Sequence, residues 1–145
     1  MATRVLSHAW SARATILLPG DEVARLLLRI DDSHWYAIEA SGRHIGVVAQ
    51  IGPLQQVVAT AEIDPDLGPI HQEIACNDSP LAGQPGKNTR PDEVSLGFRK
   101  HGQLRTLARM DGRYLSTEVA GGFTGRVIGL AATSGMVLRA GVLCR

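Results

Sequence analysis

The chain of 145 residues is poor in aromatic residues and in long apolar runs. Aromatic side chains make up 4% of it, which argues against a broad sugar-stacking surface. No apolar run approaches the roughly 20 residues of a membrane-spanning helix. Lys and Arg (15) balance Asp and Glu (14), so the composition favours neither a nucleic-acid nor a membrane partner. We expect a cytoplasmic protein without a secretion signal.

Cysteine and clustered metal ligands are also scarce. The two cysteines, Cys76 and Cys144, are far apart and form no Cys-x-x-Cys motif. Two buried thiols are therefore expected rather than a disulfide. The histidines stand singly without the spacing of a zinc site, and we expect no metal and no cofactor.

A period of two in the apolar residues dominates the rest of the chain and is typical of half-buried strands. In 44–51, Ile45, Val47, Ala49 and Ile51 fall on one face. In 56–63, the same pattern places Val57, Ala59, Ala61 and Ile63 together. The pattern predicts strands at 14–18, 24–30, 35–40, 44–51, 56–63, 70–75, 93–99, 104–109, 126–132 and 136–142.

Glycine-, proline- and aspartate-rich turns separate these strands, as at Asp31-Asp32-Ser33, Ser41-Gly42 and Lys100-His101-Gly102. Many short strands at regular spacing indicate an all-β sandwich with little or no helix. We expect residues 1–145 to form one domain. Residues 77–92, with three prolines and two glycines, are expected to form a long mobile loop.

Catalytic patterns are weak. Asp32-Ser33-His34 has the residue types of a triad, but neighbours on one turn cannot converge as a triad must. Glycoside hydrolysis needs two carboxylates held apart on a rigid site. The available carboxylates occupy solvent-face strand or turn positions: Glu39, Glu62, Glu73 and Asp111. Asp31-Asp32 and Asp64-Pro65-Asp66 could offer oxygen ligands to calcium, but we interpret both as turns, in which aspartate caps its own backbone. We assign no catalytic residue.

Residues 111–130 read DGRYLSTEVAGGFTGRVIGL and contain the most distinctive pattern of the chain. Gly121-Gly122 needs permissive backbone angles and places Phe123-Thr124 in a loop before a strand. The Phe123 ring either contacts a ligand or folds back to cap the sandwich. Trp35 and Tyr36 point to opposite faces of one strand, so that one ring is buried and the other is available.

This segment resembles the C-terminal concanavalin A-like domain of family 43 glycoside hydrolases, the β-xylosidases and their relatives. Leu115-Ser116-Thr117-Glu118, residues 121–125 and Val127-Ile128-Gly129 match its pattern. Residues 28–36, 51–54 and 90–92 also resemble family segments in the right order. The resemblance implies a concanavalin A-like jelly-roll β-sandwich of two antiparallel sheets, packed against a five-bladed propeller that holds the catalytic carboxylates.

The resemblance also implies that a loop aromatic, here Phe123, closes one side of the propeller's sugar pocket. Two features depart from the family: residues 137–145 replace an aromatic-rich last strand, and the beginning looks short, as though a first strand or a linker were missing. The chain is then a fragment, a truncation product or a stand-alone descendant.

Three hypotheses follow. The chain is a non-catalytic accessory domain for a propeller partner, a lectin-like module that binds xylo-oligosaccharides, or a small enzyme that uses surface carboxylates. In the first two, the candidate ligand-contacting residues are Gly122, Phe123, Thr124 and Trp35. Exposed strand edges could also recruit a second copy of the chain.

Overall fold

The computed structural model describes residues 2–4, 10–17, 23–64, 68–77, 93–115, 126–132 and 136–144, and these residues form mainly antiparallel strands. The strands are β1 (Ala2–Arg4), β2 (Trp10–Leu17), β3 (Val23–Asp31), β4 (His34–Ser41), β5 (His44–Ile51), β6 (Leu54–Glu62), β7 (Ile70–Asn77), β8 (Glu93–Lys100), β9 (Gln103–Asp111), β10 (Val127–Ala132) and β11 (Met136–Cys144). One 3-10 turn, η2 (Gly112–Leu115), follows β9.

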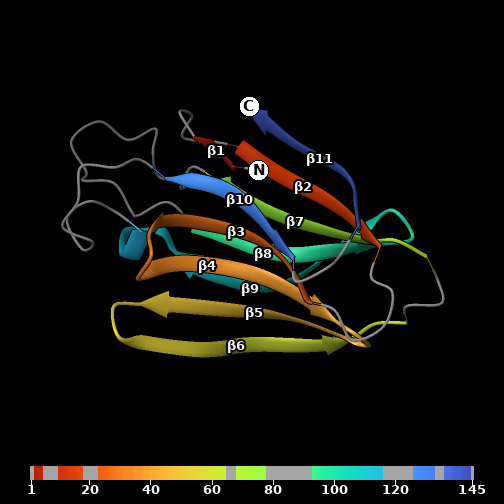
Figure 1. Ribbon diagram of the computed structural model, residues 1–145, viewed down its shortest axis with the longest axis horizontal. Coiled ribbons are helices and arrows are strands. Elements are labelled where there is room, and N and C mark those ends of the chain that lie inside the picture. Colours follow the sequence, from red (N-terminus) through yellow and green to blue (C-terminus); the bar gives the residue numbers. More distant parts are fainter. Residues whose placement is uncertain are drawn as a thin grey trace.

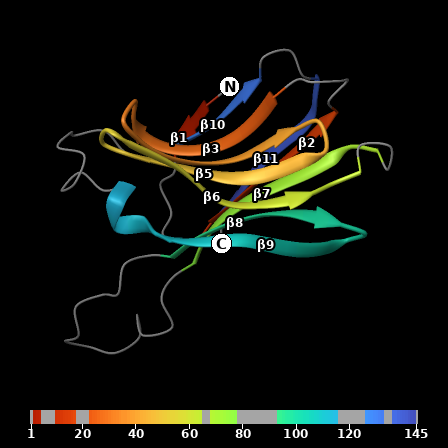
Figure 2. The ribbon, with the colours of Figure 1, turned by 90° about the horizontal axis from the view of Figure 1, so that it is seen from below.

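The strands form two sheets that pack face to face. The six-stranded sheet has the order β1-β10-β3-β4-β5-β6, and the five-stranded sheet has the order β11-β2-β7-β8-β9. Figure 1 shows the six-stranded sheet in front of the five-stranded one, and Figure 2 shows the two as curved layers. This is the two-sheet antiparallel sandwich that the alternating pattern predicts, with η2 as the one helical turn among the described residues.

Alternate residues of both sheets fill the space between the layers. In β5, Ile45, Val47 and Ala49 point inward and are buried, as predicted. Phe98 of β8 is likewise buried. The largest fully buried side chain among the described residues is Trp10 at the start of β2, four residues before the predicted start of this strand.

Strand β6 corrects one prediction. Val48 pairs with Val57 while Val47 pairs with Ala59, so Val58 is an extra residue in the ladder. Because a bulge adds one residue to a period of two, Val57 and Ala59 fall on opposite faces instead of the same one. Val57 is consequently exposed and Ala59 is half-buried.

The beginning and end of the chain also differ from expectation. The first strand was predicted to start at Ala14, but β2 starts at Trp10, and Ala2–Arg4 form β1 beside β10. The atypical C-terminal residues still form a full strand, because β11 pairs with β2 from Met136 to Cys144. The predicted 77–92 loop lies outside the described residues, apart from Asn77, which ends β7.

The strand register also bears on the two cysteines. Trp10 of β2 is opposite Cys144 on one side and opposite Cys76 on the other. The two cysteines are thus two strands apart, or about 9–10 Å at the usual strand spacing. A disulfide needs Cα atoms within about 7 Å, so this register prevents the pairing. Cys76 is a buried thiol, as expected.

Among the described residues, no helix has the length and apolar character that crossing a membrane requires.

Candidate functional site

The predicted ligand-contacting residues Gly122, Phe123 and Thr124 lie in 116–125, outside the described residues. The structure does describe both ends of this segment. Residue 115 ends η2, and residue 126 directly precedes β10. We call Asp111–Leu115 together with Arg126 the loop base. In Figure 1, η2 lies at the left end of the sandwich, beside the turn that joins β3 to β4.

Arg126 joins the two ends of the loop base. Its Nη2 donates a hydrogen bond to the Gly112 carbonyl at 2.7 Å, and its Nε donates to the Leu115 carbonyl at 3.0 Å. Charged donors make the stronger hydrogen bonds of a folded protein, and these two satisfy the carbonyls of the first and last residues of η2. Arg126 thereby fixes where the chain leaves η2 relative to where it returns to β10.

Two buried side chains hold the loop base on the core. Leu115 is fully buried and belongs to the apolar cluster between the sheets. Tyr36 of β4 is also fully buried, and its hydroxyl donates a hydrogen bond to the Asp111 carbonyl at 2.6 Å. A buried tyrosine needs such a partner for its hydroxyl. The Tyr36 side chain therefore links the end of β9 to the six-stranded sheet.

The neighbouring turn between β3 and β4 is cross-linked as well. Asp31 Oδ1 accepts hydrogen bonds from the Ser33 backbone N–H at 2.8 Å and interacts with His34 Nδ1 at 2.9 Å. The hydrogen bond to His34 is the main cause that lowers the pKa of the Asp31 carboxyl. The Gly52 N–H donates to the Ser33 carbonyl at 2.8 Å, which joins this turn to the β5–β6 turn. Asp31 acts here as a turn residue, as the sequence indicated.

Trp35 lies on the outer face of the six-stranded sheet, while Tyr36 faces the core, so the predicted division of the pair is confirmed. The Arg25 guanidinium lies 5.6 Å from the centroid of the Trp35 ring and also forms an ion pair with Glu39. Ala37, which lies between Trp35 and Glu39 on this face, is fully buried. A stacking sugar would therefore have to compete with the Arg25 cation for the indole ring.

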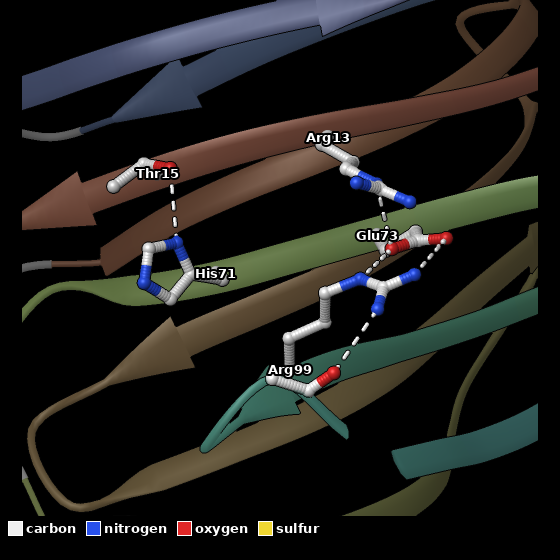
Figure 3. A network of polar contacts seen from close by, with 6 residues as sticks. Arg13, Thr15, His71, Glu73 and Arg99 are labelled. Carbon is white, nitrogen blue, oxygen red and sulfur yellow. Dashed lines mark hydrogen bonds and ion pairs between the residues drawn. The ribbon is translucent and has the colours of Figure 1, made fainter. Parts of the chain in front are cut away.

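A second polar network crosses the outer face of the five-stranded sheet (Figure 3). Glu73 of β7 interacts with Arg13 Nε at 3.0 Å and with Arg99 Nε at 2.7 Å. Its side chain is 4% exposed, although its strand position faces outward. The expectation that Glu73 is solvent-facing is therefore wrong in effect, because two arginines cover the carboxylate.

The carboxylates considered for hydrolysis are divided between the two sheets. Glu39 and Glu62 belong to the six-stranded sheet, and Glu73 to the five-stranded one. Glu39 and Glu73 point away from the core on opposite sides and are ion-paired with arginines. Asp111 ends β9 at the loop base. Over the described part of the chain, no three His, Cys, Asp or Glu residues are grouped as metal ligands.

A known family model matches residues 3–139, and it describes the C-terminal concanavalin A-like domain of β-xylosidases. The chain belongs to this family. Membership was predicted from Leu115-Ser116-Thr117-Glu118 and the segments around it, and it is confirmed over most of the chain. The concanavalin A-like sandwich that the resemblance implied is the fold observed.

Solved structures of family 43 proteins share this fold. The Bacteroides ovatus protein described as xyloglucan PUL GH43B is 20% identical to this chain, with a TM-score of 0.69. The GH43 protein BlXynB of Bacillus licheniformis is 16% identical, with a TM-score of 0.71. Each similarity covers 97% of this chain and 27% of the other chain. A xylan β-1,4-xylosidase of Bacillus halodurans is 13% identical with a TM-score of 0.67, over 90% of this chain and 25% of its own. This chain therefore spans about a quarter of each relative.

Two residues that hold the loop base were not predicted from the sequence as candidate site residues. Tyr36 had been considered only as one of two alternating aromatics, and Arg126 only as the start of a strand. A signal existed for Arg126, because it directly follows residues 121–125 of the family motif, whereas no local pattern connects Tyr36 with Asp111. Reasoning from the sequence also missed Tyr114, an aromatic side chain that η2 exposes by 45% beside the segment 116–125.

Proposed function

We propose that this chain is a non-catalytic accessory domain that packs against a family 43 propeller and lines its sugar pocket through Phe123 and Thr124. The observation that carries the proposal is the family match over residues 3–139, together with the 25–27% share of its structural relatives that the chain spans. In such an arrangement the propeller supplies the catalytic carboxylates. The sandwich supplies one wall.

The loop base supports this role physically. A residue that lines another domain's pocket must be held in position, because a displacement of about 1 Å weakens catalysis strongly. Arg126, Tyr36 and Leu115 provide that support at both ends of the segment 116–125. Exposed Tyr114 adds a second aromatic surface beside it.

An antibody against the sandwich tests the partnership in the source cells, where the proposed location is the cytoplasm. If the domain and propeller share a chain, the detected protein is roughly three and a half times the 15.5 kDa of this sequence, because 97% of this chain corresponds to 27% of its relative. If they are separate chains, a protein of 15.5 kDa co-purifies with a propeller protein that hydrolyses nitrophenyl xyloside. A lone 15.5 kDa protein without such a partner contradicts the proposal.

The role of Phe123 is tested in that same assembly. Phe123→Ala should lower kcat/KM for nitrophenyl xyloside by about tenfold, the size expected when one apolar wall of a pocket is lost. Phe123→Tyr should retain most of the activity. Leu104→Ala, at an exposed apolar side chain on β9, serves as the control and should behave like the wild type. Equal activity of all variants would remove Phe123 from the pocket.

Calorimetry on the isolated chain separates this proposal from the lectin hypothesis. Trp35 is half-buried with the Arg25 guanidinium near its ring, and Tyr114 is the one exposed ring among the described aromatic residues. We therefore expect no binding heat with xylotetraose at about 10 mM, well above the range of specific sugar sites. Saturable heat that Phe123→Ala or Trp35→Ala abolishes would support instead the lectin hypothesis, in which the Phe123 segment binds the sugar.

A further inference from the structure

The end of the sandwich opposite the loop base contains a hollow that the proposed function does not use. Its volume is about 160 Å³, and it lies where the β6–β7 connection meets the β8–β9 turn. We call it the basic hollow and define it by its lining residues: Ile63, Asp64, residues 68–71 and residues 98–101. An engineered apolar cavity of about 150 Å³ holds a benzene molecule, so this volume corresponds to one six-membered ring.

The inner wall of the basic hollow is apolar. Ile63, Ile70 and Phe98 line it and also belong to the core or pack against it. Because these side chains are packed on the sandwich core, the wall is formed without any ligand. Preformed apolar walls with a few converging polar groups are the usual composition of small-molecule sites.

The rim carries mostly basic groups. Four of its side chains, His71, Arg99, Lys100 and His101, are basic, and Asp64 is the one acidic side chain that lines the hollow. Arg99 is already engaged by Glu73, but that carboxylate is shared with Arg13, so the three groups retain one net positive charge (Figure 3). A concave surface with an excess of one charge attracts ligands of the opposite charge.

Of the four basic side chains at the rim, two already have protein partners. His71 Nδ1 is 3.0 Å from Thr15 Oγ1, and Arg99 donates to the Gly102 carbonyl at 3.4 Å as well as to Glu73. Lys100 and His101, in contrast, have no side-chain partner among the residues that the structure describes. Both are exposed and both line the hollow.

The backbone of the turn places His101 at this rim. His101 and Gly102 both have positive φ values, 51° and 76°, as the two-residue turn of a hairpin requires. Asn or Gly is the usual residue at the first of these positions. His adopts the same left-handed conformation and adds an imidazole, whose N–H can donate a hydrogen bond to an anion.

From these features we infer that the basic hollow binds a ring-sized organic carboxylate, with the ring against Ile63, Ile70 and Phe98 and the carboxylate toward Lys100 and His101. A hexuronic acid and an aromatic carboxylic acid share this chemistry. The site requires no propeller, so its test is independent of the proposed accessory role.

The test is an NMR titration of the ¹⁵N-labelled chain with glucuronate, benzoate and glucose at constant ionic strength. A ligand of a dozen non-hydrogen atoms is expected to bind with a Kd on the order of 1 mM. Glucuronate, benzoate or both should give saturable shifts at residues 63–64, 68–71 and 98–101, and their relative Kd values identify the sugar or the aromatic acid as the preferred source. Glucose should give none.

The variant Lys100→Gln/His101→Asn should bind at least about tenfold more weakly, since it loses one charge and one imidazole donor. Asn retains the left-handed turn, so this variant stays folded. Arg109→Gln removes the same charge elsewhere on the five-stranded sheet and should bind within about twofold of the wild type. The inference is overturned if the shifts lie at another surface, or if glucose binds as strongly as the acids. It is also overturned if the double variant binds unchanged, or if no saturation is reached at about 20 times the expected Kd.

Discussion

The two ends of the sandwich share one core but differ in how their polar side chains are used. At the loop base, buried or half-buried side chains donate hydrogen bonds to backbone carbonyls, as Tyr36 does to Asp111 and Arg126 to Gly112 and Leu115. At the basic hollow, Lys100 and His101 extend into solvent around an apolar wall. The first arrangement fixes the backbone of residues 111–115 relative to Arg126, whereas the second leaves groups available for a ligand. Strand ends in one fold can thus be specialised by a few side chains.

The largest effect should come from removing the apolar anchor of the loop base. Leu115→Ala deletes a fully buried side chain and should lower the free energy of unfolding by about 2–5 kcal/mol. Ile63→Ala, at a half-buried residue of the basic hollow, should cost about 1 kcal/mol, because less apolar surface leaves the core. Urea unfolding measures both. Equal losses would mean that the two ends are not differently anchored.

The next effect concerns the charged brace. Arg126→Met keeps the aliphatic stem but removes both hydrogen bonds to the Gly112 and Leu115 carbonyls, and should cost about 2–3 kcal/mol. Lys100→Met at the opposite end should change stability by less than about 0.5 kcal/mol, as an exposed substitution does. Thermal unfolding followed by circular dichroism gives both values. A neutral Arg126→Met would show that the loop base stands without its arginine.

A smaller effect is expected at the turn of the basic hollow. His101→Val should destabilise the chain by about 1–2 kcal/mol, because a β-branched residue resists positive φ. His101→Asn should be neutral within about 0.5 kcal/mol, because Asn tolerates this conformation. Chemical unfolding of the two variants is the measurement. If Val and Asn behave alike, the left-handed turn is not a constraint at this end.

The smallest effect should be the pH dependence contributed by Asp31. Its pKa is lowered in the folded chain, chiefly by the hydrogen bond to His34. The stabilisation is therefore complete above the unfolded-state pKa of about 3.9 and is lost as the pH falls through the lower folded-state value. Asp31→Asn retains an acceptor for the Ser33 N–H but removes the titration. Wild type and variant should differ less in stability at pH 3 than at pH 6, and a constant difference would contradict the assignment.

The alternating residues of the chain predicted most of the fold. In β3, β4 and β5 the inward positions hold large apolar residues such as Leu26, Ile38 and Ile45, so period two is plain in the sequence. The same alternation was missed at the start of β2, where Trp10, Ala12, Ala14 and Ile16 face the core and the exposed Arg13 lies between them, because Ala12 and Ala14 are small and give a weak apolar signal. The bulge at Val58 was also not predictable, because it depends on the register with β5.

The candidate site was predictable only in part. The family motif drew attention to residues 115–129, and the structure shows how that segment is held at its two ends. The partners that hold it come from elsewhere: Tyr36 is 75 residues from Asp111 in sequence. Likewise, the Glu73 carboxylate is covered by arginines from two neighbouring strands, Arg13 and Arg99, which no local pattern connects.

Local alternation, turn residues and a contiguous motif were thus enough to predict the all-β class, most strand positions and the family. The side chains that hold the loop base and those that surround the basic hollow became evident from the folded chain. Both sites are assembled from residues of different strands. Their spacing is set by sheet order and register, which are properties of the packed sandwich rather than of any one segment.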